Sequence, residues 1–129
     1  MWWRRRKLLS DRVRLGRWGE KRAERFLRRR GFRALARNVS CKTGELDLVM
    51  IDPEGMLVFV EVKTRADEGF APAEAAITGA KQRRITQAAR YFLRTHDLQD
   101  HPCRFDVVSI VVGTSGRPEI RHHEGAFTP

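Results

Sequence analysis

The sequence predicts a single α/β domain with a mixed central β-sheet and a helix on each side, in the order αβββαββ. Two observations carry this prediction. Apolar and polar residues alternate with a period of two in residues 44–65, which is typical of strands, whereas apolar residues recur with a helical period in residues 15–30 and 79–95. The length of 129 residues suits one domain with one core.

Residues 44–65 predict two antiparallel strands joined by a tight turn. The two runs are rich in β-branched and aromatic residues, and the sequence Asp-Pro-Glu-Gly at positions 52–55 lies between them. Proline fits the first central position of a type I turn, and glycine tolerates a left-handed backbone. We therefore expect a three-residue loop, residues 53–55, closed by Asp52 facing Met56.

This register brings charged side chains together on one face of the hairpin. Asp47 then faces Glu61, and Glu45 faces Lys63. Two carboxylates directly opposite each other destabilise an ordinary sheet, and Mg²⁺ is typically held by one or two carboxylates plus substrate phosphates. We therefore expect a cation site at Asp47 and Glu61, with Lys63 positioned to meet a phosphate or an attacking water.

The alternative interpretation is a solvated polar face on which Glu45 and Lys63 form a surface ion pair. The nearly continuous apolar run at residues 58–62 favours the cation site, because it indicates a central strand covered on both sides. Acidic residues and a lysine in such a strand need a specific reason.

The remaining elements are predicted in chain order from apolar stripes and end signals. Gly31 is expected to end the first helix, Thr78 to cap the second long helix, and Pro72 to begin a short helical turn. The predicted elements are a helix at residues 15–30, a strand at 31–39, the hairpin at 44–65, a helical turn at 73–77, a helix at 79–95, a strand at 104–112 and an edge strand at 119–123.

Basic residues are concentrated at the N-terminal end. The first 37 residues hold fifteen Arg or Lys and three Asp or Glu, a net charge of +12, whereas the rest of the chain holds eleven and thirteen, a net charge of −2. This asymmetry favours binding to a polyanion such as nucleic acid, over the alternatives of mere solubility or an arginine-rich codon usage. Residues 1–14 are interpreted as a basic arm, and residues 15–129 as the domain.

Several classes of protein are disfavoured by composition. No run of 18 apolar residues is present, so no membrane span is predicted, and the apolar segment after the basic start is too short for a signal peptide. Cys41 and Cys103 lack metal-ligand spacing and are interpreted as reduced thiols of a cytoplasmic protein. Asp106 is expected to have a structural role, and His96 and His101 to be exposed.

The motifs together resemble a known family. Asp47 followed by Glu61-Val62-Lys63 resembles the PD-(D/E)xK signature of restriction-endonuclease-like folds, with Leu46 in place of the proline that gives the signature its name. The wider pattern, from about residue 16 to residue 127, resembles the YraN-like family of predicted endonucleases, which is related to archaeal Holliday junction resolvases. The blocks that carry it are Gly16-Arg17-Trp18-Gly19-Glu20, Arg37-Asn38, Gly44-Glu45-Leu46-Asp47-Leu48, Phe59-Val60-Glu61-Val62-Lys63-Thr64-Arg65, Lys81 and Arg104-Phe105-Asp106-Val107-Val108.

The resemblance implies a restriction-endonuclease-like core and a Mg²⁺- or Mn²⁺-dependent endonuclease that acts on DNA, with branched or junction DNA as one candidate substrate. It assigns catalytic roles to Glu20, Asp47, Glu61 and Lys63, and metal binding to the three carboxylates, with the Val62 carbonyl as a further ligand. From the residues alone, Glu20 would be an ordinary exposed glutamate on the first helix. The candidates for contacts with nucleic acid are Arg17, Lys21, Lys42, Arg65 and Lys81.

Two other functions compete with the nuclease. The domain could be a non-catalytic nucleic-acid-binding adaptor that kept the fold, or an RNA-associated protein, because arginine-rich segments bind RNA equally well. All three predict binding that weakens steeply with salt. The intact set of Asp47, Glu61 and Lys63 favours the enzyme. The relationship to junction resolvases also implies a homodimer, although the sequence shows no apolar dimer stripe.

Overall fold

The computed structural model of the protein describes residues 11–69, 71–113 and 116–128. Most of the predicted basic arm therefore lies outside the described residues. The elements in chain order are α2 (Arg12–Arg29), β1 (Arg33–Cys41), β2 (Gly44–Ile51), β3 (Leu57–Arg65), the 3-10 turn η1 (Ala73–Ala76), α3 (Gly79–Thr95), β4 (Cys103–Val111) and β5 (Glu119–Phe127).

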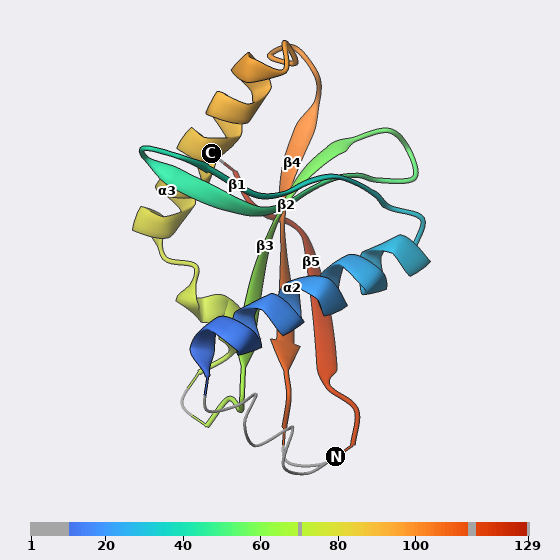
Figure 1. The fold of residues 1–129 in the computed structure, drawn as a ribbon, viewed down its shortest axis with the longest axis vertical. Coiled ribbons are helices and arrows are strands. Elements are labelled where there is room, and N and C mark those ends of the chain that lie inside the picture. The colour runs from blue at the N-terminus through green and yellow to red at the C-terminus, as the bar shows by residue number, and fades with distance from the viewer. Residues whose placement is uncertain (1–10, 70, 114–115, 129) are drawn as a thin grey trace.

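The strands form one five-stranded sheet in the order β1-β2-β3-β4-β5, as the fold prediction requires. Neighbours are antiparallel except for β3 and β4, which are parallel and are connected through η1 and α3. Helix α2 crosses one face of the sheet, and α3 packs on the opposite face (Figure 1). The predicted mixed α/β architecture is confirmed, and β3 is the central strand.

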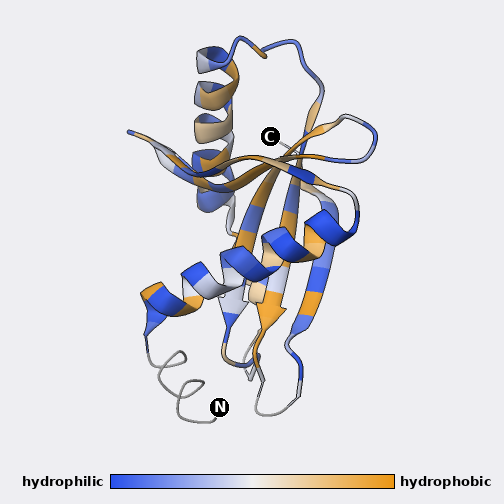
Figure 2. Cartoon of the chain, turned by 45° about the vertical axis from the view of Figure 1, so that its right-hand side comes forward, coloured by the Kyte–Doolittle hydropathy of each residue, from blue (hydrophilic) through white to orange (hydrophobic). Residues whose placement is uncertain are grey.

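Two apolar clusters fill the spaces between these layers. Successive residues of β3 point to opposite faces of the sheet and therefore belong to different clusters. Phe59 packs with Phe92 of α3, whereas Val58 and Val60 pack with Leu27 of α2. Figure 2 shows apolar strands in the centre of the molecule and a mostly hydrophilic α2 with apolar residues at intervals. Within the described residues, no helix is both long and apolar enough to cross a membrane.

The hairpin forms with the predicted loop and register. The Asp52 N–H donates to the Met56 carbonyl at 2.9 Å, and the Asp52 carboxylate accepts the N–H groups of Glu54 and Met56, each at 2.9 Å. Gly55 adopts the left-handed backbone expected of it, with φ of +89°. The pairs Ile51–Leu57 to Leu48–Val60 then follow in register.

Helix α3 has the predicted bounds, and the Thr78 hydroxyl caps it by accepting the Lys81 N–H at 3.3 Å. Helix α2, however, begins at Arg12 rather than at residue 15. Its N-cap is Asp11, whose carboxylate accepts the N–H groups of Val13 and Arg14 at 3.0 and 3.2 Å. Residues 12–14 therefore belong to the helix and not to the arm.

Three strands also differ from their predicted bounds, β4 by a single residue at each end. Strand β1 is displaced by two residues, because the chain turns at Gly31 before the strand starts. Strand β5 continues to Phe127 instead of ending at residue 123. Its second half lacks alternation, but Phe127 pairs with Phe105 of β4 across an irregularity in the ladder and stacks on its ring at 5.0 Å.

A buried charge network fixes the ends of the central strands. The Arg104 guanidinium donates to Asp52 at 2.6 Å and to both carboxylate oxygens of Asp106 at 3.0 and 3.2 Å, and His122 lies 2.8 Å from Asp106. Asp106 is 0% exposed. Burial opposes the ionised form of Asp106, but hydrogen bonds from His122, Arg104 and the Gly125 N–H outweigh this and lower its pKa. Its predicted structural role fits this network.

Replacing Arg104 with alanine should lower the free energy of unfolding by about 3–5 kcal/mol, because the buried Asp106 carboxylate would lose the cation that neutralises it. Urea denaturation at pH 7 measures this loss, and Arg33→Ala on the exposed end of β1 is the matched control. A loss below about 1 kcal/mol would contradict a structural role for the network.

Candidate functional site

The site lies where strands β2 and β3 part from each other. Their ladder ends at the Leu48–Val60 pair. One step further, where Asp47 would face Glu61, the Asp47 carboxylate instead accepts the N–H of Val62 at 2.8 Å. The side chain of Asp47 thus replaces a backbone partner, and this opens the sheet beside the two acidic residues.

Asp47 and Glu61 form the buried carboxylate pair that the register predicts. They are 7% and 6% exposed, and their side chains are hydrogen-bonded to each other. Burial and the repulsion from Asp47 raise the pKa of Glu61 to about 8. Burial also raises the pKa of Asp47, against the stabilising hydrogen bond from Val62. Without a cation, the pair therefore holds a proton at neutral pH.

Two lysines from different elements border the pair. The Lys81 ammonium at the start of α3 lies 3.5 Å from the Glu61 carboxylate. Lys63 on β3 is half-buried, and burial together with the nearby Lys81 and Arg65 lowers its pKa to about 8. The polar-face interpretation required a surface ion pair between Glu45 and Lys63. This pair is not among the ion pairs of residues 11–69, 71–113 and 116–128.

Glu20 reaches the same region from α2, on the other side of the sheet. Burial and repulsion from Asp47 raise its pKa to about 7, against a hydrogen bond from the Asn38 side chain. Gly19 permits this close approach, because a Cβ at that position would lie 1.8 Å from the Thr64 hydroxyl oxygen. Glycine is therefore required where α2 crosses the end of β3.

These side chains surround a cleft of about 570 Å³, which we term the carboxylate cleft. Both helices and the sheet contribute to it, and it brings together all four predicted catalytic residues with two of the five predicted nucleic-acid contacts, Arg65 and Lys81. Its lining is Arg12, Leu15, Gly16, Glu20, Glu45, Asp47, Glu61, Val62, Lys63, Thr64, Arg65, Ala66, Asp67 and Lys81.

Three of the five predicted nucleic-acid contacts lie outside the carboxylate cleft. Arg17 and Lys21 line a neighbouring groove along α2, and Lys42 lies beside α3. The five candidates therefore surround the carboxylate pair on separate surfaces and do not form one patch.

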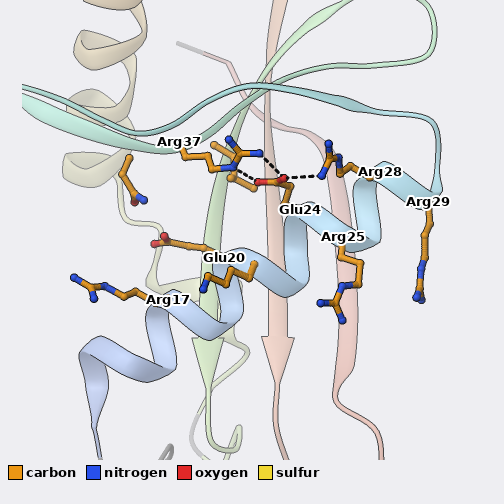
Figure 3. A pocket seen from close by; sticks show the side chains of 10 residues that line it. Arg17, Glu20, Glu24, Arg25, Arg28, Arg29 and Arg37 are labelled. Carbon is orange, nitrogen blue, oxygen red and sulfur yellow. Dashed lines mark hydrogen bonds and ion pairs between the residues drawn. The ribbon is translucent and has the colours of Figure 1, made fainter.

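The groove along α2 has a volume of about 610 Å³ and shares Glu20 with the carboxylate cleft. Figure 3 shows Arg28 and Arg37 directed at Glu24, whereas Arg17, Arg25 and Arg29 extend from the helix without a partner among the residues drawn. This arginine-rich surface begins at the edge of the carboxylate cleft, so positive charge adjoins the acidic pair.

The sequence did not reveal the role of Glu24. Its carboxylate accepts a two-pronged contact from Arg37 of β1, with Nη2–Oε2 at 2.7 Å, and lies 3.4 Å from Arg28. The hydrogen bonds from Arg37 lower the pKa of Glu24 despite its burial. The pair fastens β1 to α2. Helical periodicity places Glu24 beside the apolar stripe, which is the one signal that could have indicated its burial.

The donor set can be compared with the needs of a divalent cation. Within the described residues, no group of three or more His, Cys, Asp or Glu side chains is arranged to hold a metal ion. Asp47 and Glu61 form a buried pair, and Glu20 borders the same cleft. Two buried carboxylates that must otherwise share a proton suit Mg²⁺, which takes one or two carboxylates and completes its shell with water and phosphate.

The fold and the site define an α/β protein with a buried carboxylate pair and a neighbouring lysine at the open edge of a mixed sheet. Residues 19–110 match the model of the family described as "Uncharacterised protein family UPF0102". The chain belongs to this family, and the resemblance to the YraN-like family is thereby confirmed.

Individual relatives agree with this assignment. The chain is 47% identical over 110 residues to a UPF0102 protein of Pelobacter propionicus, covering 84% of this chain and 79% of the relative. It is 53% identical over 95 residues to one of Cupriavidus taiwanensis, covering 74% and 72%. It is 44% identical over 114 residues to one of Symbiobacterium thermophilum, covering 88% and 96%.

Proposed function

We propose that this protein is a cytoplasmic, Mg²⁺-dependent endonuclease of the PD-(D/E)xK type that hydrolyses phosphodiester bonds in DNA. The observation that carries the proposal is the buried Asp47–Glu61 pair, which faces an open cleft beside Lys63. Two carboxylates buried side by side destabilise the folded protein, and such arrangements are concentrated at functional sites, where a bound ligand compensates the charge.

Each residue then has a defined role. Asp47 and Glu61 would hold the cation, and Mg²⁺ or Mn²⁺ would supply Lewis-acid catalysis there and activate a water for attack. Lys63, on the same strand as Glu61, orients the attacking water or neutralises charge that develops on the phosphate. The Lys81 ammonium lies 3.5 Å from the Glu61 carboxylate and borders the same cleft, where it would bind a phosphate of the substrate.

The charge distribution supports nucleic acid as the substrate, and the family resemblance favours DNA. The net charge is +10, and the excess lies in the N-terminal part that includes α2. The groove along α2 therefore presents a positive surface next to the carboxylate cleft. A phosphate backbone held there can extend past Glu20 to the acidic pair.

A non-catalytic adaptor is the second candidate. It is favoured by one observation, that Glu20 does not join Asp47 and Glu61 in a three-residue metal cluster within the described chain. An adaptor would bind nucleic acid through the same basic surfaces, but it would not need the buried carboxylate pair.

Cleavage of a labelled panel tests the proposal. Duplex, single-stranded, flap and four-way-junction DNA would each be incubated with Mg²⁺, Mn²⁺ or EDTA, beside Asp47→Ala purified identically. We expect cutting that requires the metal and that Asp47→Ala lacks, because the variant has lost half of the carboxylate pair. Absence of cutting on every substrate, with salt-sensitive binding retained, would reject the enzyme in favour of the adaptor.

A further inference from the structure

We propose that a cleft beside α3 binds an unpaired nucleotide strand and leads it to the carboxylate pair. Binding in this cleft is independent of catalysis, whereas cleavage of the bound strand rests on the proposed function. This α3 cleft has a volume of about 650 Å³. It is lined by Cys41, Lys42, Thr43, Gln87, Arg90, Tyr91 and Arg94.

The α3 cleft is connected to the acidic site. A second hollow of about 460 Å³ shares Cys41, Lys42 and Thr43 with it, and reaches Glu61 and Lys81 at its other end. The turn that separates β1 from β2 thus lies between the α3 cleft and the carboxylate pair. A strand that passes over this turn remains in contact with polar side chains throughout.

The side chains of the α3 cleft suit a nucleotide. Gln87, Arg90, Tyr91 and Arg94 are spaced along α3 so that they share one face of the helix, opposite its buried stripe. Tyr91 is 41% exposed, and it is the only tyrosine of the chain. An exposed aromatic ring among cations offers a stacking surface for a base, with the cations placed to bind its phosphates.

The charge of the α3 cleft is not neutralised from within. Its lining includes Lys42, Arg90 and Arg94 but no carboxylate. Among the ion pairs formed by the described part of the chain, none involves these three residues. A single exposed aromatic residue is common on protein surfaces, but three unpaired cations around it favour an anionic, base-carrying ligand.

The wall of the α3 cleft is fixed by close packing. A Cβ on Gly44 would lie 2.4 Å from the carbonyl oxygen of Arg84, so the chain after Thr43 rests directly against α3. This packing therefore fixes the width of the α3 cleft. Stacking on Tyr91 requires an exposed base face, which a duplex covers with neighbouring base pairs, so the ligand is an unpaired strand.

Binding measured without cleavage tests this inference. Fluorescence anisotropy in EDTA would compare fluorescein-labelled 12-nucleotide oligothymidylate, oligouridylate and a 12-base-pair duplex on the full-length protein. Tyr91→Ala should weaken single-strand binding by about 5- to 100-fold, the loss of one stacked base, whereas Tyr91→Phe should retain it. Duplex binding should change less than about twofold, because the duplex contacts phosphate-binding surfaces elsewhere. Leu35→Ala, another exposed apolar side chain, is the matched control.

A second measurement locates the base. A single 5-iodouracil in the oligothymidylate should cross-link to Tyr91 on irradiation, as mapped by mass spectrometry, and excess unlabelled single strand should suppress the product. Unchanged single-strand affinity of Tyr91→Ala, or an equal loss on duplex, would overturn the inference. Because neither measurement needs a metal, the α3 cleft can be confirmed even where the cleavage panel rejects the enzyme.

Discussion

Replacing Lys63 with alanine should lower the rate of metal-dependent cleavage by a factor of about 100 to 10,000, the usual contribution of a positioned acid–base or charged group. Lys63 follows Glu61 by two residues on β3 and lines the carboxylate cleft. Its ammonium is therefore held next to the proposed cation, where the attacking water and the scissile phosphate would meet. Binding of DNA should change little, because other basic residues hold the backbone.

Lys63→Arg separates the two roles of this side chain. Arginine keeps the positive charge but does not give up its proton in proteins, and its planar group is bulkier. We would measure single-turnover cleavage rates and unfolding curves for the parent, Lys63→Ala and Lys63→Arg. The unfolding curves show whether a slower variant is misfolded or is folded and impaired in catalysis. A Lys63→Ala variant that cuts at the parental rate would remove Lys63 from the site.

Replacing Glu61 with glutamine should stabilise the metal-free protein above neutral pH, by an amount on the order of a few kcal/mol. In the folded protein the pKa of Glu61 is raised from 4.5 to about 8. Between these values the folded state retains a proton that the unfolded state has lost, so the stability of the parent falls as the pH rises through this window. Glutamine at position 61 cannot ionise, so the variant does not lose this stability as the pH rises.

Urea denaturation in EDTA between pH 4 and pH 9 measures this difference, with Glu54→Gln, an exposed carboxylate in the hairpin turn away from the cleft, as the control. The Glu61→Gln and parental curves should agree near pH 4 and separate towards pH 8. Mg²⁺ should restore stability to the parent at high pH but not to the variant, because a cation replaces the shared proton. A constant difference in unfolding free energy between Glu61→Gln and the parent at every pH would show that the pKa of Glu61 is not raised in the folded protein.

Local sequence determined the parts of this fold that short-range chemistry controls. The turn at residues 52–55 set the register of the hairpin, and that register placed Asp47 beside Glu61. Thr78 gave the start of α3. These predictions succeeded because turn geometry, capping and alternation each depend on neighbours within a few residues. The start of α2 is not encoded by its apolar stripe, which begins at Leu15, whereas the Asp11 side chain caps a helix that begins three residues earlier.

Only the tertiary structure decided what surrounds the carboxylate pair. The separation of β2 from β3 lets Glu20 approach from one side of the sheet and Lys81 from the other, and no sequence period encodes that meeting. The partners of Glu24 and Asp106 are likewise distant in the chain. Long-range packing selects such partners, because burial makes an unpaired charge costly and any suitably placed opposite charge can satisfy it.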